Sequence, residues 1–433
     1  MTGWLLESET PMSHLRASSI LNPEVESRPP ADRVAYLENR LRQTIAHAYM
    51  NAPRFRVAMD AAAVGPRDIH RLADLSKIPI TRKDDLPAIQ AEDLPFGGLV
   101  AVPMRSLKRI FISPGNIYDL QGQGPDFWRF RPALAAAGFR SGDIVLNTFS
   151  YHMTPAGFML DGALRALGCV VVPSGPGNTE IQVRIASDLG ATGYVGTPSF
   201  LYIILKKAAE MRSPLQLEVA WVTAEMLPES LRHELETDFG IRVLQGYGTA
   251  DLGMLAYECL EKQGMHLHPE VIVEVLDLET GEPVAPGHPG LVVATIFDET
   301  YPLVRFATGD LSTFLEDAPC SCGRTAPKLA GILGRVGDAV KVKGMFVRGS
   351  QVEEVLKRFP EVGRFQAVVT REAHKDRLRY IVELNSDAKE DGLKDRIAEA
   401  LRELLKVRGE VELVPPGTIP AGAKKIDDKR VWK

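Results

Sequence analysis

The feature that most restricts the fold is a regular alternation of apolar and amphipathic runs between residues 143 and 200. Three apolar runs, DIVLNTF, CVVVPSG and GYVGTP, are separated by AGFMLDGALRALG and IQVRIASDLG, whose apolar residues recur at helical spacing. Near-continuous apolar strands that alternate with helices indicate a parallel sheet covered by helices. The expected fold class is therefore α/β. Ligands in such sheets bind beyond the carboxyl ends of the strands.

That rule places residues 174–179, 197–199 and 223–226 on one rim of the sheet, because each segment follows an apolar run. Beside them we expect QGYGTADLG (residues 245–253), as a strand end that turns into a glycine-hinged loop. The ring of Tyr247 suits stacking on a base, and the Asp251 carboxylate suits a cation near phosphates. The same residues also suit an ordinary glycine-rich turn.

A second loop, IFISPG (residues 110–115), places Ser113 after an apolar strand. Such loops present backbone N–H groups to phosphate, although this one has a single glycine before Asn116 and no nearby lysine. An ordinary turn is the alternative. Residues 68–86 contain short helical patterns, and we interpret their charges as a solvated face.

The second half of the chain contains two cysteine clusters that flank predicted β structure. Cys259 precedes GMHLH (residues 264–268), and Cys320 and Cys322 form a CxC pair. Thiolate and imidazole ligands at four positions suit tetrahedral zinc, with unrelated free thiols as the alternative. Cys169 lies in an apolar run, so we expect a packed core residue.

The stretch VRFATGD (residues 304–310) ends in Asp310, whose carboxylate suits the hydroxyls of a ribose.

Apolar and polar residues alternate over residues 270–284, and the segment turns at Glu279, which predicts a hairpin. Beyond residue 338 the pattern changes to a small α+β unit, with one predicted helix face made by Leu393, Ile397, Leu401 and Leu404.

Composition excludes several function classes. A length of 433 residues indicates more than one domain, and 45% apolar with 25% charged residues is typical of a globular protein. The net charge of −5 gives no reason to expect nucleic acid or an anionic membrane as partner. No apolar run reaches the ~18 residues of a spanning helix, and the first residues lack the pattern of a secretory signal. We therefore expect a cytoplasmic protein.

From about residue 35 onward the chain resembles the adenylate-forming acyl-CoA synthetases, in particular their phenylacetate–coenzyme A ligase branch. The resemblance rests on the order and spacing of motifs that include SKIPITRKDDL, GTPS, TAEM, GYGTADLGMLAYEC, RFATGDLS, CSCGRT and GRVGDAVKVKG. It implies a large N-terminal AMP-binding domain (residues 1–337), with helix-covered parallel sheets and a β subdomain. A small mobile α+β domain (residues 338–433) is joined to it at a hinge.

The resemblance also implies roles for individual residues. It places Tyr247 near adenine, with Ala224, Glu225, Gly248, Thr249 and Ser113 lining the nucleotide site. Asp310 and Arg335 match the ribose contacts, Asp251 the magnesium-binding glutamate, and Asp338 the hinge. The resemblance implies a structural zinc bound by Cys259, His266, Cys320 and Cys322. His268 is the alternative to His266 as a ligand.

The implied reaction is ATP-dependent activation of a carboxylic acid, aryl or arylacetic in class, to an acyl-adenylate and its transfer to coenzyme A. Three positions depart from the family pattern. The phosphate loop reads SPGNIYDLQG without a lysine, Ala250 and Asp251 replace a hydroxyl residue and a glutamate, and the C-terminal lysine is out of register. We choose Lys424 for that catalytic lysine, with Lys425 as the alternative. A nucleotide- or adenylate-binding protein with impaired adenylation is therefore the alternative function. The acid and the oligomeric state stay open, a homodimer included.

Overall fold

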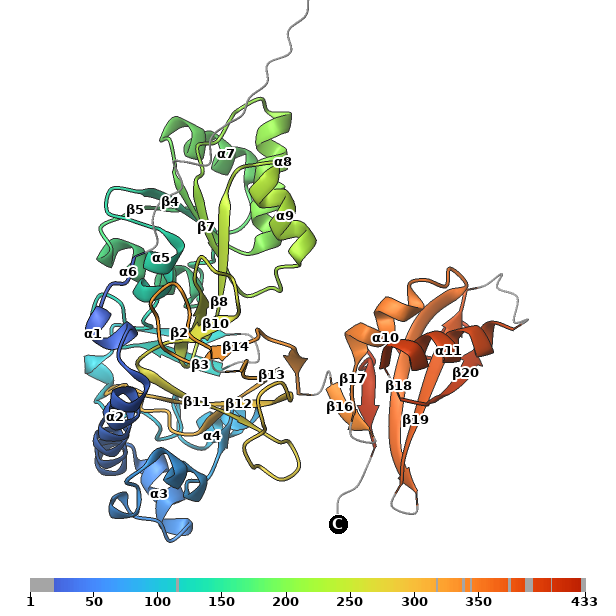
Figure 1. The fold of residues 1–433 in the computed structure, drawn as a ribbon, viewed down its shortest axis with the longest axis horizontal. Coiled ribbons are helices and arrows are strands. Elements are labelled where there is room, and N and C mark those ends of the chain that lie inside the picture. The colour runs from blue at the N-terminus through green and yellow to red at the C-terminus, as the bar shows by residue number, and fades with distance from the viewer. Residues whose placement is uncertain are drawn as a thin grey trace, which may run out of the picture. The chain divides into compact units, whose positions relative to one another are not determined.

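The structure is a computed structural model that describes residues 19–113, 117–316, 318–336, 339–342, 345–372, 375–385, 392–405 and 407–429. The chain divides into two compact units (Figure 1). The larger contains the residues up to Thr308 together with Ser312–Ile332, and the smaller contains Gly309–Leu311 and the residues from Leu333 onward.

An eight-stranded sheet forms the centre of the larger unit in the described part of the chain. Its strands, in order across the sheet, are β14 (Lys328–Leu329), β10 (Met265–Leu267), β9 (Gly253–Glu258), β8 (Arg242–Thr249), β7 (Val219–Val222), β6 (Gly193–Gly196), β4 (Ile144–Asn147) and β5 (Val170–Pro173). The strands from β8 to β5 run parallel, and β9, β10 and β14 extend the sheet antiparallel. The predicted α/β fold, with a parallel sheet over residues 143–200, is confirmed.

Helices cover both faces of this sheet (Figure 1). The helices are α5 (Arg131–Ala137), α6 (Ala156–Ala166), α7 (Thr179–Asp188), α8 (Pro198–Glu210) and α9 (Glu229–Thr237). One face packs on α5 and α6, and the other on α7, α8 and α9, because alternate strand residues belong to two separate apolar cores. Helix α8 begins where the Thr197 hydroxyl accepts the N–H of Phe200, and Pro198 occupies its first turn.

A second sheet is mainly antiparallel, as expected for a β subdomain. Its strands are β1 (Thr81–Arg82), β13 (Phe306–Ser312), β12 (Gly290–Ile296) and β11 (Val271–Leu276), and β15 (Gly334–Arg335) pairs with β13. A separate hairpin consists of β2 (Arg109–Ser113) and β3 (Ile117–Gln121). The predicted hairpin over residues 270–284 is only partly correct. The turn forms a single bridge between Leu276 and Pro283, and the main partner of β11 is β12.

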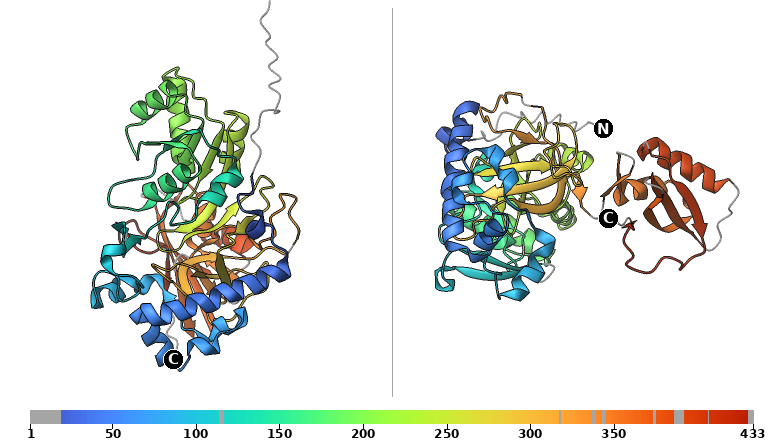
Figure 2. Two further views of the ribbon diagram at one scale, coloured as in Figure 1. Left: turned by 90° about the vertical axis from the view of Figure 1, so that its left-hand side faces the viewer. Right: turned by 90° about the horizontal axis from the view of Figure 1, so that it is seen from below.

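The N-terminal helices are part of the larger unit. They are α1 (Pro23–Glu26), α2 (Pro30–Asn51), α3 (Pro53–Ala61) and α4 (Leu86–Glu92), with 3-10 helices at Pro66–Asp68, Leu72–Lys77, Lys83–Asp85 and Met104–Ser106. Helix α2 is the long blue helix of Figure 2. Its residues Leu41, Ile45 and Ala48 are fully buried in a core that also contains Ile272 and Val304.

The smaller unit is α+β, as expected. A four-stranded sheet has the order β20 (Glu410–Val414), β19 (Lys375–Leu384), β18 (Val362–Glu372) and β21 (Ile426–Asp428). A hairpin of β16 (Ala339–Val342) and β17 (Met345–Arg348) and the helices α10 (Gly349–Leu356) and α11 (Leu393–Leu405) complete it. The buried face of α11 ends at Leu405, which is 2% exposed, whereas the predicted Leu404 is 38% exposed. The buried residues of α11 follow one another at intervals of four from Leu393 to Leu405, so they lie on one face of the helix.

Among the described residues, none of the helices combines the length and the apolar character that crossing a membrane requires.

Candidate active site

The predicted rim segments do follow the carboxyl ends of parallel strands of one sheet, namely β5, β6 and β7. Thr223 directly follows β7, and its hydroxyl donates to the carbonyl oxygen of Gly246 on β8 at 2.8 Å. The Thr223 N–H donates to Gly196 at the end of β6. Ala224 has a φ of +70°, a left-handed conformation that non-glycine residues rarely adopt. The side chains of Ala224 and Glu225 are exposed, and their backbone lies at the edge where ligands of α/β sheets bind.

The stretch from Gln245 to Gly253 is more ordered than the predicted loop. Strand β8 continues to Thr249, with a register irregularity at Gly248, and then turns tightly into antiparallel β9. A Cβ atom at Gly253, whose φ is +71°, would lie 2.5 Å from the Trp128 carbonyl oxygen, so this turn needs glycine. Tyr247 is 7% exposed and belongs to an apolar core. Within this turn, the Thr249 hydroxyl accepts a hydrogen bond from the Leu252 N–H.

Asp251 occupies this turn and is buried. One of its carboxylate oxygens, Oδ2, pairs with the Lys83 ammonium at 2.5 Å. The Lys83 side chain is 19% exposed, so the prediction of a solvated charged face over residues 68–86 is wrong at this position. The sequence offered no signal for the pair, because its partners are 168 residues apart.

Ser113 ends β2, and its hydroxyl donates to the Ile117 carbonyl oxygen across the hairpin at 3.4 Å. The rest of the predicted phosphate loop, residues 114–116, lies outside the described residues.

The two residues predicted to contact ribose are neighbours in the smaller unit. Asp310 on β13 and Arg335 on β15 are in register, and the Arg335 Nε lies 3.2 Å from Asp310 Oδ1. The arginine side chain is 57% exposed and that of the aspartate 14%, so the guanidinium is open to an incoming ligand. The predicted hinge residue, Asp338, lies outside the described residues.

The four predicted zinc ligands form one cluster. The ligand atoms of Cys259, His266, Cys320 and Cys322 all lie within 4.8 Å of one another. The Cys259 and Cys320 sulfurs are 3.7 Å apart, and Cys322 Sγ lies 3.5 Å from His266 Nε2. Tetrahedral zinc with Zn–S of ~2.3 Å and Zn–N of ~2.0–2.1 Å requires separations of about 3.8 Å and 3.5 Å, so both observed distances fit.

Neighbouring groups orient the cluster. His266 Nδ1 lies 3.3 Å from the Ala326 carbonyl oxygen, which leaves Nε2 facing the sulfurs. The Arg324 N–H donates to Cys322 Sγ at 3.4 Å. Cys259, the His266 ring and this N–H lower the pKa of the Cys322 thiol, which favours the thiolate that binds metal. His268 lies outside the cluster, where its Nδ1 accepts the N–H of Glu270.

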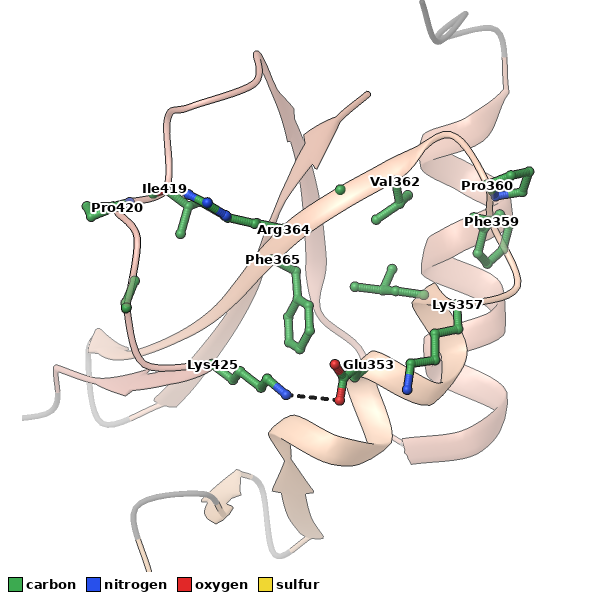
Figure 3. A pocket seen from close by; sticks show the side chains of 14 residues that line it. Glu353, Lys357, Phe359, Pro360, Val362, Arg364, Phe365, Ile419, Pro420 and Lys425 are labelled. Carbon is green, nitrogen blue, oxygen red and sulfur yellow. Dashed lines mark hydrogen bonds and ion pairs between the residues drawn. The ribbon is translucent and has the colours of Figure 1, made fainter. Parts of the chain in front are cut away.

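The two candidate lysines near the C-terminus differ in their surroundings. Lys425 lines a pocket of about 480 Å³ in the smaller unit, where its ammonium pairs with Glu353 at 2.9 Å (Figure 3). The side chain of Lys424 is exposed, and its ammonium makes no ion pair or hydrogen bond within the described ranges. Its backbone carbonyl accepts the amide of Gln366. Among the described residues, Lys425 is therefore paired with Glu353, whereas the ammonium of Lys424 has no ion-pair partner.

Comparison with known proteins agrees with this fold. The family model of AMP-binding enzymes matches residues 116–295, and that of the AMP-binding enzyme C-terminal domain matches residues 344–432. A solved structure of 2-hydroxyisobutyryl-CoA ligase, in an open conformation with 2-HIB-AMP and CoA, has a TM-score of 0.81 and 23% identity. The match covers 94% of each chain. The fold and the family models thus define the class as adenylate-forming AMP-binding enzymes.

Curated relatives identify the family to which the chain belongs within this class. The phenylacetate-coenzyme A ligase of Thermus thermophilus is 34% identical over 432 residues, covering 92% of this chain and 96% of the relative. That of Escherichia coli is 30% identical over 413 residues, covering 89% and 92%. The chain belongs to the phenylacetate–coenzyme A ligase family, and it is an acid–thiol ligase of the AMP-forming kind.

Proposed function

We propose that this ligase uses ATP to activate an aryl or arylacetic acid and transfers the acyl group to coenzyme A. The observation that supports this most strongly is the identity to phenylacetate-coenzyme A ligases through both units of the chain. Aromatic residues beyond the end of β4 support the substrate class. The Tyr151 and Phe158 rings meet edge to face at 5.1 Å, and Phe158 also packs on Phe111.

The first half-reaction joins the acid to AMP. A carboxylate oxygen attacks the α-phosphorus of ATP, the bond to the β-phosphate oxygen breaks, and pyrophosphate leaves with its electron pair. In such transfers, catalysis depends mainly on positioning and on stabilising developing charge. In the second half-reaction the thiolate of coenzyme A attacks the acyl carbon. AMP then leaves with the bridging oxygen that came from the acid.

We propose for the rim residues and for Asp310 and Arg335 the nucleotide-binding roles that the family resemblance implies. The backbone of Ala224 and Glu225, the hairpin residues Gly248 and Thr249, and the ring of Tyr247 line the adenine site, with Ser113 toward the phosphates. Asp310 accepts the ribose hydroxyls, and Arg335, which pairs with that carboxylate, also contacts the ribose.

Two charged residues serve the transfer step. Asp251 Oδ1 is buried without a partner among the described residues, so it is available as an oxygen ligand of Mg²⁺. The metal, when bound, neutralises charge on the phosphates. Lys424 supplies an ammonium to the transferring phosphate, with Lys425 as the alternative.

We assign residues 1–337 to the adenylation domain and residues 338–433 to a mobile domain that turns about Asp338 between the two half-reactions. The Cys259, His266, Cys320 and Cys322 cluster is proposed to hold one structural zinc. Its donor set of three sulfurs and one imidazole, and the separations given above, fit that ion.

Pyrophosphate release from ATP across a panel of aryl and arylacetic acids tests the proposal. We expect release that depends on the acid, and an acyl-CoA product when coenzyme A is added. Pyrophosphate release without dependence on any acid of the panel would contradict the substrate class.

A synthetic acyl-adenylate separates the ligase from the alternative, a binding protein with impaired adenylation. None of the relatives named above is described as a binding protein without activity. Because the phosphate loop lacks its lysine, we expect thioester formation to be faster from the preformed adenylate than from acid plus ATP. Thioester from the adenylate alone, with no product from acid plus ATP, would favour the alternative.

A further inference from the structure

The turn that contains Asp251 is held by Trp128, a residue of the segment before α5. The Trp128 indole Nε1–H donates to the carbonyl oxygen of Ala250 at 3.1 Å. The Trp128 carbonyl oxygen accepts the Met254 N–H at 2.9 Å. Trp128 is 2% exposed and is 122 residues away from Ala250 in the sequence. One buried residue therefore fixes both ends of the turn.

Arg129 holds the turn on the other side of Asp251. Its Nη2 donates to the carbonyl oxygen of Leu252, and its Nη1 lies 3.9 Å from a carboxylate oxygen of Asp298. A guanidinium group is planar and always charged, so its hydrogen bonds are strong and well directed. Arg129 also has a φ of +65°, which is rare for a non-glycine residue and persists only where the surrounding structure enforces it.

The segment that makes these contacts is itself well anchored. The Asp126 carboxylate accepts the N–H groups of Phe130 and Arg131 at 2.9 Å and 3.0 Å, where α5 begins. The Trp128 ring meets the Phe127 ring edge to face, with ring centroids 5.2 Å apart. It belongs to the apolar core that α5 and α6 share with the sheet. The hydrogen bonds to the turn therefore come from a part of the chain that is fixed independently of the turn.

These contacts act on the two residues that flank Asp251. Ala250 precedes it and Leu252 follows it, so the peptide groups on both sides of Asp251 are hydrogen-bonded. The Asp251 side chain is left with Oδ2 paired to Lys83 and with Oδ1 unpartnered among the described residues. Groups that orient a metal-binding carboxylate commonly change metal affinity tenfold or more when they are removed.

We propose that Trp128 and Arg129 are positioning residues for Asp251 in the adenylation step. They hold the two flanking carbonyl groups, and the Asp251 carboxylate thereby keeps the orientation in which it meets Mg²⁺. The magnesium role of Asp251 rests on the proposed function, whereas the hold on the turn does not. Thioester formation from a finished acyl-adenylate releases no pyrophosphate, so it depends less on this arrangement.

Trp128→Phe is the principal variant, because it keeps an aromatic ring in the core and deletes the N–H that reaches Ala250. Trp221→Phe is the matched control. Trp221 is fully buried, and its Nε1 has no hydrogen-bond partner within the described ranges. Both variants remove the same atoms, so a difference between them reports the hydrogen bond to the turn.

Hydrogen exchange, followed by mass spectrometry of a peptide that spans residues 249–255, measures how firmly the turn is held. We expect faster exchange in Trp128→Phe than in the wild type, because the turn loses one of its contacts. Exchange of the same peptide should be unchanged in Trp221→Phe.

The Mg²⁺ dependence of pyrophosphate release measures the effect on Asp251. The Mg²⁺ concentration for half-maximal release should rise about two- to tenfold in Trp128→Phe, which is the range expected for one lost hydrogen bond. Thioester formation from a preformed acyl-adenylate should stay near the wild-type rate. A general loss of structure would slow both half-reactions together.

Arg129→Lys keeps the proposal testable if Trp128→Phe fails to fold. Lysine keeps the positive charge beside Asp298 but lacks the planar fork that reaches Leu252. The same two changes are expected, in exchange and in Mg²⁺ dependence.

The proposal is overturned by unchanged exchange in Trp128→Phe, by an unchanged Mg²⁺ requirement, or by an equal rise in Trp221→Phe. Equal slowing of both half-reactions would overturn it as well. Wild-type protein that releases no pyrophosphate would contradict the proposed function. The exchange measurement needs no activity, so it would still show whether Trp128 holds the turn.

Discussion

At the scale of single residues, Asp310 gives the clearest prediction. Its side chain is 14% exposed and is held by Arg335 at 3.2 Å. Replacing Asp310 by alanine should weaken AMP and ATP binding together, because the ribose hydroxyls lose their acceptor. A hydrogen bond to a charged group is worth ~1.5–3 kcal/mol, so calorimetry should show a loss of roughly ten- to a hundredfold. Unchanged affinity would mean that the nucleotide binds elsewhere.

The two lysines near the C-terminus allow a second prediction. Lys424→Met should slow pyrophosphate release, while thioester formation from a preformed acyl-adenylate stays near the wild-type rate, because only the first half-reaction involves attack on the α-phosphorus, where the Lys424 ammonium is proposed to act. Lys425→Met removes the pair with Glu353 and is the matched comparison. Steady-state rates of the two half-reactions measure both effects. The opposite ranking of the two variants would assign the role to Lys425.

Individual site residues could be predicted from the sequence where both the type of side chain and its spacing from the other site residues were informative. Cys259, His266, Cys320 and Cys322 were predicted together as zinc ligands, and their ligand atoms do lie within 4.8 Å of one another, in a group that could hold a metal ion. The prediction failed for Lys83, since a lysine in a charged segment looks the same whether it faces water or a partner 168 residues away.

At the scale of elements, the cluster of the four proposed zinc ligands connects the end of β9, strand β10 and the loop at residues 320–322. Purified protein should contain about one zinc. Cys320→Ser should lower zinc affinity at least about tenfold and lower the melting temperature, because the metal links segments that are 61 residues apart. The rate of adenylation at low temperature should change little.

Metal analysis and thermal melting, each with and without chelator, check this prediction. Cys169→Ser is the matched control, since this buried cysteine lies outside the cluster and its sulfur contacts the Arg140 carbonyl. Zinc-free protein, purified without chelator and as stable as chelated protein, would refute the structural role.

The alternation of strands and helices over residues 143–200 was predictable, because the apolar spacings typical of strands and of helices recur in turn and a turn residue stands at each boundary. The hairpin of β8 and β9 was mistaken for an irregular loop. Its glycines suggest flexibility in the sequence, but Gly253 is needed for close approach to Trp128, and Gly248 lies at the register irregularity of a paired strand. The pairing of β8 with β9 and with β7 makes this stretch a strand, and the spacing of the glycines alone does not show that pairing.

At the scale of the whole molecule, the chain consists of two compact units, and relatives match it through both. Composition and the order of the motifs predicted an α/β chain with a larger and a smaller unit. The position of the hinge at Asp338 stays a prediction, because that residue lies outside the described ranges. The particular acid could not be predicted either, since the aromatic rings near Tyr151 suit packing as well as substrate binding.

The central claim is that the acid attacks the α-phosphorus of ATP, and an isotope measurement tests it most directly. Phenylacetic acid labelled with ¹⁸O in both carboxylate oxygens is incubated with the protein, ATP and coenzyme A, and the products are analysed by mass spectrometry. The account predicts AMP that contains one ¹⁸O atom, because the bridging oxygen of the acyl-adenylate leaves with AMP. Unlabelled AMP, or ADP with the label in inorganic phosphate, would contradict it.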